Sequence, residues 1–343
     1  MINRLLATML AIVTAAAMAG CSSDADDDTP KLVIAYQDNG IPALVKQSGV
    51  LDGAPYQVDW AILAGPAANL SALYGKTIDV GHMGDTSLTI EQANAATDWG
   101  PQNTPLKIVA GWRNGFDPQY TPLVTAVRTT AGIHTRADLR GHSWAYNFGG
   151  YNHGQYLVSL AKAGLSESDI TPVKFNDGNA SAAAFNSGQV DVYSGSQAAI
   201  LQSITSGDAK ILLTDRDTGI PALNVWTART DVLADPAKDS ALRDFFARLA
   251  TFWDWYDQNP DAVKQTLKST LKLTDERTDF EYQVRSGGFR KLDAPLVAEE
   301  QAVADELARS GVVKKRVDVA VEYDPRYNEA QKAQGPAPVP ALR

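Results

Sequence analysis

Residues 78–96 read IDVGHMGDTSLTIEQANAA, and this stretch decides which class of fold the chain adopts. It begins with a short, mainly apolar run, Ile78–Met83, of the kind that forms a buried strand. Gly84 allows the backbone to turn tightly, and Thr86 or Ser87 can cap the helix that is expected to follow. A strand that runs directly into a helix is the building unit of a parallel α/β sheet.

The same alternation of strands and helices extends in both directions from this stretch. In the first part of the chain, strands are expected at Leu32–Tyr36, Gln57–Leu63 and Leu106–Trp112, and helices at Pro42–Gln47, Ala67–Tyr74 and Ser87–Ala96. In the second part, strands are expected at Ser143–Asn147, Thr171–Phe175, Val190–Tyr193 and Lys210–Leu213, and helices at Gly154–Ala163, Asn179–Asn186 and Gln197–Ser206. The spacing of both sets predicts crossover helices between parallel strands.

Two apolar runs, Leu123–Val127 and Leu223–Ala228, lie at the junctions of these sets, where the chain is expected to cross between lobes. We therefore expect an α/β protein with two lobes, in which each lobe is a mainly parallel sheet flanked by helices. A ligand cleft is expected between the lobes, at the carboxyl ends of the strands. The predicted bounds are 31–120 and 225–330 for a discontinuous lobe 1, 121–224 for lobe 2, and 331–343 for a loose tail.

The composition is that of a globular protein and excludes several functions. A chain of 343 residues is longer than one hydrophobic core usually serves, which favours two domains. Its 31 basic and 40 acidic residues give a net charge of −9, which argues against binding of nucleic acid. One cysteine excludes an internal disulfide and a thiolate metal cluster, and the four histidines lack the spacing of metal ligands. We expect neither a metal nor a cofactor.

The first twenty residues have the pattern of an export signal. Arg4 precedes an apolar run, Leu5–Met18, which is too short to span a membrane. The sequence Met-Ala-Gly-Cys at 18–21 resembles the bacterial lipobox, and this resemblance implies cleavage before Cys21 and attachment of lipid to it. A plain secretory signal with a chance cysteine is the alternative. Residues 21–30 would form an acidic tether, and the protein would be anchored by lipid at the extracytoplasmic face of the cell membrane.

Three turns between a strand and a helix are candidates for ligand binding. They are Gly84–Ser87, the glycine-rich turn at 147–153, and Ser194–Gln197. The start of a helix offers unpaired N–H groups and a partial positive charge, which suit an anion. Small capping residues explain any single turn equally well, but three such turns in both lobes favour an anion site. Asn152 and Ser194 are candidates within these turns.

Aromatic residues near strand ends are candidates for stacking on the apolar part of a ligand. Trp112, Tyr193 and Trp226 occupy such positions. Arg113 follows Trp112 directly, and both pairing with an anion and an ion pair at the rim are possible roles for it. The aromatic residues repeated at helical spacing within 239–257 are interpreted as core packing.

Four stretches together resemble substrate-binding lipoproteins of ABC importers, in the branch that binds aliphatic sulfonates, taurine and nitrate. They are IAYQ at 34–37, GHMGDT at 81–86, YNFGGYNH at 146–153 and AAAFNSGQVD at 182–191. The resemblance implies a type II periplasmic-binding-protein-like fold, whose two lobes close on a small organic anion and deliver it to a membrane permease. By position, it implies an anion pocket formed by Gln37, Asn39, Gly84, Asp85, Thr86, Asn147, Gly150 and Tyr151.

The chain departs from these relatives at two places. Many of them continue after Val190-Asp191 with Trp-Asp-Pro, whose acid serves amine-bearing ligands, whereas here the chain continues from Val192 to Gln197 without an acid or a proline. This disfavours an amino-sulfonate. Phe148 stands where relatives often have a basic or polar residue, which suggests a larger, more apolar organic part and makes nitrate less favoured.

We therefore expect a monomeric extracytoplasmic solute-binding protein that captures an alkane- or arenesulfonate for an ABC permease, and not an enzyme. The motifs Gly-x-Ser-x-Gly, Gly-x-Gly-x-x-Gly and the phosphate-binding loop are absent from the sequence. Two alternatives stay open: an exported enzyme that acts on a small anionic substrate, and an envelope sensor or scaffold with the same fold.

Overall fold

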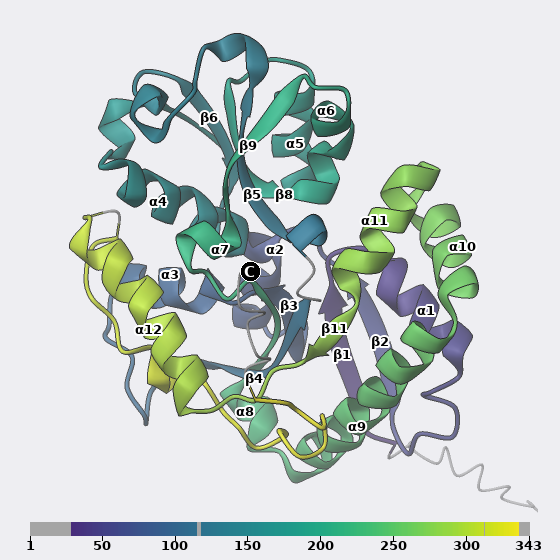
Figure 1. The fold of residues 1–343 in the computed structure, drawn as a ribbon. Helices are drawn as coiled ribbons and strands as arrows, with labels where there is room; N and C mark the ends of the chain where they lie inside the picture. The colour runs from purple at the N-terminus through teal and green to yellow at the C-terminus, as the bar shows by residue number, and fades with distance from the viewer. Residues whose placement is uncertain (1–28, 115–117, 312, 336–343) are drawn as a thin grey trace, which may run out of the picture.

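A computed structural model describes residues 29–114, 118–311 and 313–335, which form two α/β lobes (Figure 1). The cysteine at position 21 and the expected signal and tether up to residue 28 lie outside the described residues. Each lobe is built around one sheet, and the strands are short and mostly buried on both faces, as expected for α/β sheets covered by helices. The expected two-lobed α/β fold is thus present.

Lobe 1 contains a six-stranded sheet in the order β11-β4-β10-β3-β1-β2. Its strands are β1 (Lys31–Tyr36), β2 (Gln57–Ile62), β3 (Val80–Gly84), β4 (Leu106–Asn114), β10 (Leu223–Arg229) and β11 (Gly287–Phe289). The helices of this lobe are α1 (Gly40–Ser48), α2 (Pro66–Tyr74), α3 (Thr86–Asn94), α8 (Thr230–Leu233), α9 (Pro236–Gln258), α10 (Pro260–Leu271), α11 (Asp275–Arg285) and α12 (Ala294–Arg309). The longest of them, α9, packs its aromatic face into the core.

Lobe 2 contains a five-stranded sheet in the order β7-β6-β8-β5-β9. Its strands are β5 (Leu123–Arg128), β6 (Ser143–Asn147), β7 (Thr171–Phe175), β8 (Val192–Ser196) and β9 (Ala209–Thr214). Its helices are α4 (Tyr151–Ala163), α5 (Gly178–Asn186), α6 (Leu201–Thr205) and α7 (Asp215–Thr218).

Both sheets are mixed, where mainly parallel sheets were expected. The strands at the crossings between lobes account for most of this: β5 runs antiparallel to β8 and β9, and β10 runs antiparallel to β3 and β4. In lobe 1, β11 also runs antiparallel to β4. β10 begins at Leu223, which already pairs with Arg113 of lobe 1, two residues before the expected bound. We therefore propose that the chain divides into the two lobes as expected, with the second part of lobe 1 beginning at Leu223.

The expected loose tail is packed as far as residue 335. Gln331 is buried, and its side-chain amide donates to the carbonyl of Val109 at 2.8 Å. The backbone N–H of Lys291 donates to the carbonyl of Gln334 at 2.7 Å. These hydrogen bonds hold the segment against lobe 1; residues 336–343 lie outside the described part.

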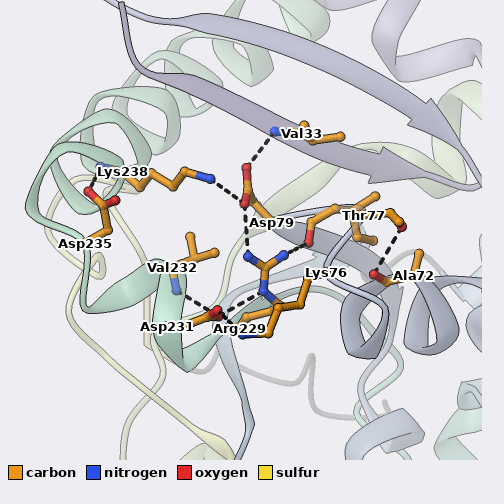
Figure 2. Close-up of polar contacts among 11 residues, drawn as sticks. Val33, Ala72, Lys76, Thr77, Asp79, Arg229, Asp231, Val232, Asp235 and Lys238 are labelled. Atoms are coloured by element: carbon orange, nitrogen blue, oxygen red, sulfur yellow. Dashed lines mark hydrogen bonds and ion pairs between the residues drawn. The ribbon is translucent and has the colours of Figure 1, made fainter. Parts of the chain in front are cut away.

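A buried carboxylate joins several segments of lobe 1 at the edge of the sheet where β1 and β3 begin (Figure 2). Asp79 accepts a hydrogen bond from the N–H of Val33 at 2.9 Å and contacts Lys238 Nζ at 2.7 Å. Arg229 Nη2 lies 3.5 Å from the same carboxylate, and Arg229 Nε pairs with Asp231 at 2.9 Å. This network connects β1, β3, β10 and the first turn of α9.

None of the helices within the described parts of the chain is both long and apolar enough to cross a bilayer.

Candidate functional site

A cavity of about 220 Å³ lies between the two lobes. Its floor consists of aromatic side chains of the lobe 1 sheet. His82 on β3 and Trp226 on β10 are partners in the register of the sheet, and their ring centroids are 4.8 Å apart. Tyr36, the last residue of β1, stacks on His82 at 4.0 Å. The cavity therefore sits where open α/β sheets usually bind ligands.

A second aromatic pair lines another part of the cavity. Trp112 on β4 and Trp253 on α9 stack with their ring centroids 3.9 Å apart. The indole N–H of Trp112 donates to the backbone carbonyl of Arg285 at 2.9 Å, which connects β4 to the end of α11. The interpretation of the α9 aromatics as core is right for Phe245 and Phe246, which are fully buried, but Trp253 also lines the cavity.

A chain of ion pairs runs along the cavity from α11 to the end of β1. Arg277 contacts Glu281 at 3.3 Å, Glu281 contacts Arg285 at 3.0 Å, and Arg285 contacts Asp38 at 3.1 Å. Three of these residues are spaced by four along α11, so their side chains share one helix face. All four line the cavity, and their charges balance.

The protonation states in this chain follow from burial and from the neighbouring charges. Burial would raise the pKa of Asp38, but the Arg285 guanidinium and the N–H of Gly40 outweigh it and hold the pKa below its usual value. Burial lowers the pKa of His82 to about 3, although Asp38 opposes this effect. The imidazole is therefore neutral at physiological pH, and Asp38 is ionised.

Lobe 2 contributes two helix starts and one strand end to the cavity. Tyr151 and Asn152 are the first residues of α4, and no side chain caps this helix. Its first N–H groups therefore have no side-chain acceptor at the helix start, which is the part of a helix where anions bind. The start of α5 is already occupied, because the Asp177 carboxylate accepts the N–H of Ala180 at 2.9 Å. Tyr193 and Ser196 on β8 also line this side of the cavity.

The structure separates the predicted site residues into two groups. The following line the cavity: Gln37, Trp112, Tyr151, Asn152, Tyr193 and Trp226. The following do not: Asn39, Gly84, Asp85, Thr86, Arg113, Asn147, Gly150 and Ser194.

The two predicted glycines serve contact between the lobes, not contact with the cavity. A Cβ atom on Gly84 would lie 2.0 Å from Cδ1 and 2.5 Å from the backbone N of Tyr151, in the other lobe. A Cβ atom on Gly150 would lie 2.5 Å from Cγ of Pro66. Thr86 lies in the same region, with its side chain against Gly154 of α4. We call this line of contact the glycine seam.

Asp85 is used by the fold itself. Its side chain accepts the N–H of Leu223 at 2.7 Å and that of Thr86 at 2.8 Å, and it is fully buried. The carboxylate therefore fastens the start of α3 to β10, and it has no face toward a ligand.

Three other predicted residues do not face the cavity: two of them make internal contacts, and the third is exposed. Arg113 pairs with Glu299 at 2.9 Å, which is the ion-pair role considered for it. The hydroxyl of Ser194 is bonded within the lobe 2 core to Thr125 at 2.8 Å. Asn39 is exposed at the start of α1, while its neighbour Asp38 faces the cavity.

Asn147 acts through Asn152. Its side-chain oxygen accepts a hydrogen bond from Asn152 Nδ2 at 2.5 Å and so orients a residue that does line the cavity. Phe148, expected to enlarge the apolar part of the site, lies outside it, with Lys174 Nζ 3.9 Å from its ring centroid. His153, for which helix packing and ligand contact were both open, stacks on Tyr146 at 4.9 Å and is a packing residue.

The charged face of α11 was missed from the sequence. Arg277, Glu281 and Arg285 lie in the part of the chain after the second crossing, where no residue beyond Trp226 was a candidate for the site. Their spacing of four residues was a signal for one charged helix face, but that pattern is also typical of a solvated surface. Only the fold shows that this face turns toward the other lobe.

Buried carboxyl groups behind α3 make stability depend on pH. Burial raises the pKa of Asp85 to about 6, although the hydrogen bonds from Leu223 and Thr86 lower it. Burial also raises the pKa of Glu300 well above its usual value, and the neighbouring Asp85 charge adds to the effect. Burial likewise raises the pKa of Glu322, against the hydroxyl of Thr89.

A raised carboxyl pKa means that the folded state holds the proton more tightly than the unfolded chain does. The contribution of these groups to the free energy of unfolding is therefore full below about pH 4 and falls as pH rises through about 6 and above. The free energy of unfolding, measured by urea denaturation, should fall between pH 5 and pH 7 in the wild type. In Glu300→Gln this fall should be smaller by roughly 1–3 kcal/mol. The exposed Glu329→Gln is the control; equal losses in wild type and Glu300→Gln would contradict the prediction.

Comparison with known proteins gives a family match and related sequences. Residues 102–276, just over half of the chain, match the NMT1/THI5-like family. A stretch of 191 residues is 30% identical to a protein of Escherichia coli (strain K12) named as an aliphatic sulfonates-binding protein. The alignment covers 55% of this chain and 54% of that protein, so the chain spans about half the length of the curated relative it matches.

Solved structures share the fold over most of the chain. The alkanesulfonate-binding protein SsuA from Xanthomonas axonopodis pv. citri, bound to MOPS, has a TM-score of 0.70 at 24% identity, covering 86% of this chain and 98% of that one. The periplasmic aliphatic sulphonate binding protein SsuA from Escherichia coli has a TM-score of 0.67 at 23% identity, covering 86% and 92%. These likenesses confirm the two-lobed fold of periplasmic binding proteins.

Proposed function

The chain belongs to the NMT1/THI5-like family, and we propose that it is the extracytoplasmic solute-binding protein of an ABC importer for small organic sulfonates. The observation that carries this proposal is the cavity between the lobes, which combines the uncapped start of α4 with an aromatic lining and two guanidinium groups. The sulfonate oxygens would accept hydrogen bonds from the first N–H groups of α4. The organic part would lie against the aromatic floor.

The charges of the cavity favour binding by hydrogen bonds over binding by a surplus of positive charge. Arg277 and Arg285 are balanced by Glu281 and Asp38. A monoanion whose charge is spread over several oxygens suits such a site, because each oxygen accepts hydrogen bonds without a full counter-charge.

The volume of the cavity favours a compact ligand. At about 220 Å³ it is smaller than the roughly 300–1,000 Å³ of sites for drug-sized molecules. We therefore propose a sulfonate with a small organic part in place of the larger one that Phe148 suggested.

Capture is favoured over turnover by the groups around the cavity. Catalysis by a hydroxyl or thiol nucleophile requires a base within hydrogen-bond reach. His82 is the one histidine among the residues that line the cavity, and its ring nitrogens have no hydrogen-bond partner in the described part of the chain. It activates no nucleophile there.

A thermal-shift panel tests this function. Compact alkanesulfonates and arenesulfonates, taurine, sulfate and nitrate should be compared at equal concentration. A sulfonate present at a hundred times its dissociation constant stabilises the protein by about 2.7 kcal/mol. Stabilisation by an unrelated solute, with none from any sulfonate, would contradict the proposal; conversion of the bound sulfonate to product would favour the enzyme alternative.

Asn152→Ala should weaken binding of the most stabilising sulfonate by about 1–3 kcal/mol, because a buried ligand oxygen would lose a hydrogen-bond partner. Isothermal titration calorimetry measures this change. Asn94→Ala is the matched control, since Asn94 Nδ2 donates to Ile90 within α3, away from the cavity. An unchanged dissociation constant for Asn152→Ala would remove this residue from the site.

We further propose that Cys21 carries the lipid anchor that places the protein beside its permease, a proposal that the lipobox-like sequence supports. Cys21→Ser should move the protein from the membrane fraction to the soluble extracytoplasmic fraction, measured by immunoblotting.

Deletion of the gene should abolish growth on the bound sulfonate as sulfur source; a sensor would leave uptake intact.

A further inference from the structure

Asp177 differs from the other carboxylates of the cavity because it has no cation beside it. Three carboxylates and two guanidinium groups line the cavity, which leaves an excess of one negative charge. The ion pairs described above join Asp38 and Glu281 to the two arginines. Asp177 forms no ion pair within the described parts of the chain, so the excess charge belongs to this residue.

The fold uses one of the two carboxylate oxygens of Asp177. Oδ1 accepts the N–H of Ala180 at 2.9 Å and so caps α5. Oδ2 has no hydrogen-bond partner among the described residues, and it is not one of their fully buried unpartnered atoms, so it keeps accessible surface. Such an oxygen in the lining of a cavity accepts a hydrogen bond from a ligand that presents a donor.

Asp177 lies beside the proposed position of the sulfonate group, in the turn between β7 and α5. A Cβ atom on the next residue, Gly178, would lie 3.4 Å from Nδ2 of Asn152 in the first turn of α4. From the other lobe, a Cβ atom on Gly65 would lie 3.6 Å from Cα of Asp177. The carboxylate is therefore placed where turns of the two lobes meet, next to the start of α4.

A plain alkanesulfonate brings a second negative charge next to this carboxylate. Two like charges at a protein surface are screened less than in bulk water, so their repulsion weakens binding. An ammonium group on the organic part of the ligand reverses this effect, because it donates charge-assisted hydrogen bonds to Oδ2. It also makes the ligand neutral overall, which suits a lining that already has an excess of one negative charge.

This carboxylate does not come from the segment in which an acid was sought in the sequence. The chain has no acid between Val192 and Gln197, which disfavoured an amino-sulfonate, but Asp177 reaches the cavity from another turn. Resting on the proposed function, we propose that Asp177 binds an ammonium group on the organic part of the sulfonate. The start of α4 holds the sulfonate group, and Asp177 makes the protein select amino-sulfonates over plain alkanesulfonates of the same length.

The experiment compares ligands of matched size by isothermal titration calorimetry on the wild-type protein. Taurine (2-aminoethanesulfonate) is compared with propane-1-sulfonate, and 3-aminopropane-1-sulfonate with butane-1-sulfonate. In each pair an ammonium group takes the place of a methyl group, and two lengths are used so that one of them spans from the start of α4 to Asp177. At one length or both, the amino-sulfonate is expected to bind at least about tenfold more tightly than its alkane counterpart, as a hydrogen bond between charged groups implies.

Asp177→Asn tests whether the carboxylate causes this preference. Asparagine caps a helix as well as aspartate does, so the start of α5 is kept and only the charge is removed. The amino-sulfonate should bind at least about tenfold more weakly to the variant, whereas the alkanesulfonate should bind more tightly, because a like charge is gone. Asp235→Asn is the matched control: Asp235 caps α9 by accepting the N–H of Ala237 at 2.9 Å and does not line the cavity, so both affinities should be unchanged.

Binding of the alkanesulfonate as tightly as the amino-sulfonate, or more tightly, at both lengths would overturn the role of Asp177. A preference for the amine that survives in Asp177→Asn would also overturn it. Equal weakening of both ligands in this variant would do the same, because it would indicate that Asp177 only maintains the structure of the site. These outcomes leave the proposed function standing, whereas absence of binding by every sulfonate overturns the function and the role of Asp177 together.

Discussion

Gly84→Ala is expected to hold the two lobes apart and to weaken sulfonate binding by about a hundredfold. The added Cβ atom would lie 2.5 Å from the backbone N of Tyr151, so rotation of a side chain cannot relieve the collision. α4 would have to move away from β3, and this movement would separate lobe 2 from lobe 1. If the closed arrangement is then populated at about 1% of its former level, the apparent dissociation constant rises by about the same factor of one hundred.

Small-angle X-ray scattering and calorimetry check this result together. With saturating sulfonate, the variant should keep a larger radius of gyration than the wild type, and its circular dichroism spectrum should be unchanged. Gly288→Ala is the matched control, because a Cβ atom there meets no atom within 4 Å. Wild-type affinity together with wild-type compaction in Gly84→Ala would show that the glycine seam plays no part in closure.

Asp79→Asn is expected to lower the free energy of unfolding by about 3 kcal/mol. The carboxylate is almost fully buried, and the substitution leaves Arg229 and Lys238 without its charge at the place where four segments of lobe 1 meet (Figure 2). Arg229 keeps Asp231 as a partner, and Lys238 is partly solvated. The loss of free energy of unfolding should therefore lie near the lower end of the range for breaking a buried ion pair, about 3–5 kcal/mol.

Urea denaturation measures this loss, with Asp59→Asn as the matched control. Asp59 pairs with Lys31 on the same sheet, but both side chains are about half exposed. Such a pair contributes about 0–1 kcal/mol. Equal losses in the two variants would contradict a structural role for the Asp79 network. Sulfonate affinity should be unaffected in Asp79→Asn, since the network lies at the opposite edge of the sheet from the cavity.

Local structure was readable from the sequence wherever an apolar run met a clear turn. The strands expected at Ser143–Asn147 and Thr171–Phe175 have these bounds in the structure. The strand and helix on either side of Gly84 are also present, with ends shifted by one or two residues. Such elements are determined by neighbours along the chain, and hydrophobic periodicity reports those directly.

The cavity was only partly readable, because its other residues are determined by contacts distant in the sequence. Asp85 is held by Leu223, 138 residues further along, which turns a plausible ligand residue into a fastening between strands. Gly84 ends β3 and is not among the glycines with a positive φ; a glycine is required there because Tyr151 of the other lobe occupies the space of a Cβ atom. Periodicity tells which face of α11 carries Arg277, and not whether that face meets water or the other lobe.

The position of β10 within the lobe 1 sheet affects the order in which the protein can be assembled. β10 lies between β3 and β4, yet it is made only after all of lobe 2. On the ribosome, the first lobe to emerge therefore lacks a central strand. β3 and β4 are not joined into one sheet until β10, about a hundred residues further along the chain, pairs with both. Lobe 2, whose strands are contiguous in the sequence, can complete its sheet first. We expect the half of the protein that is synthesised first to finish folding last.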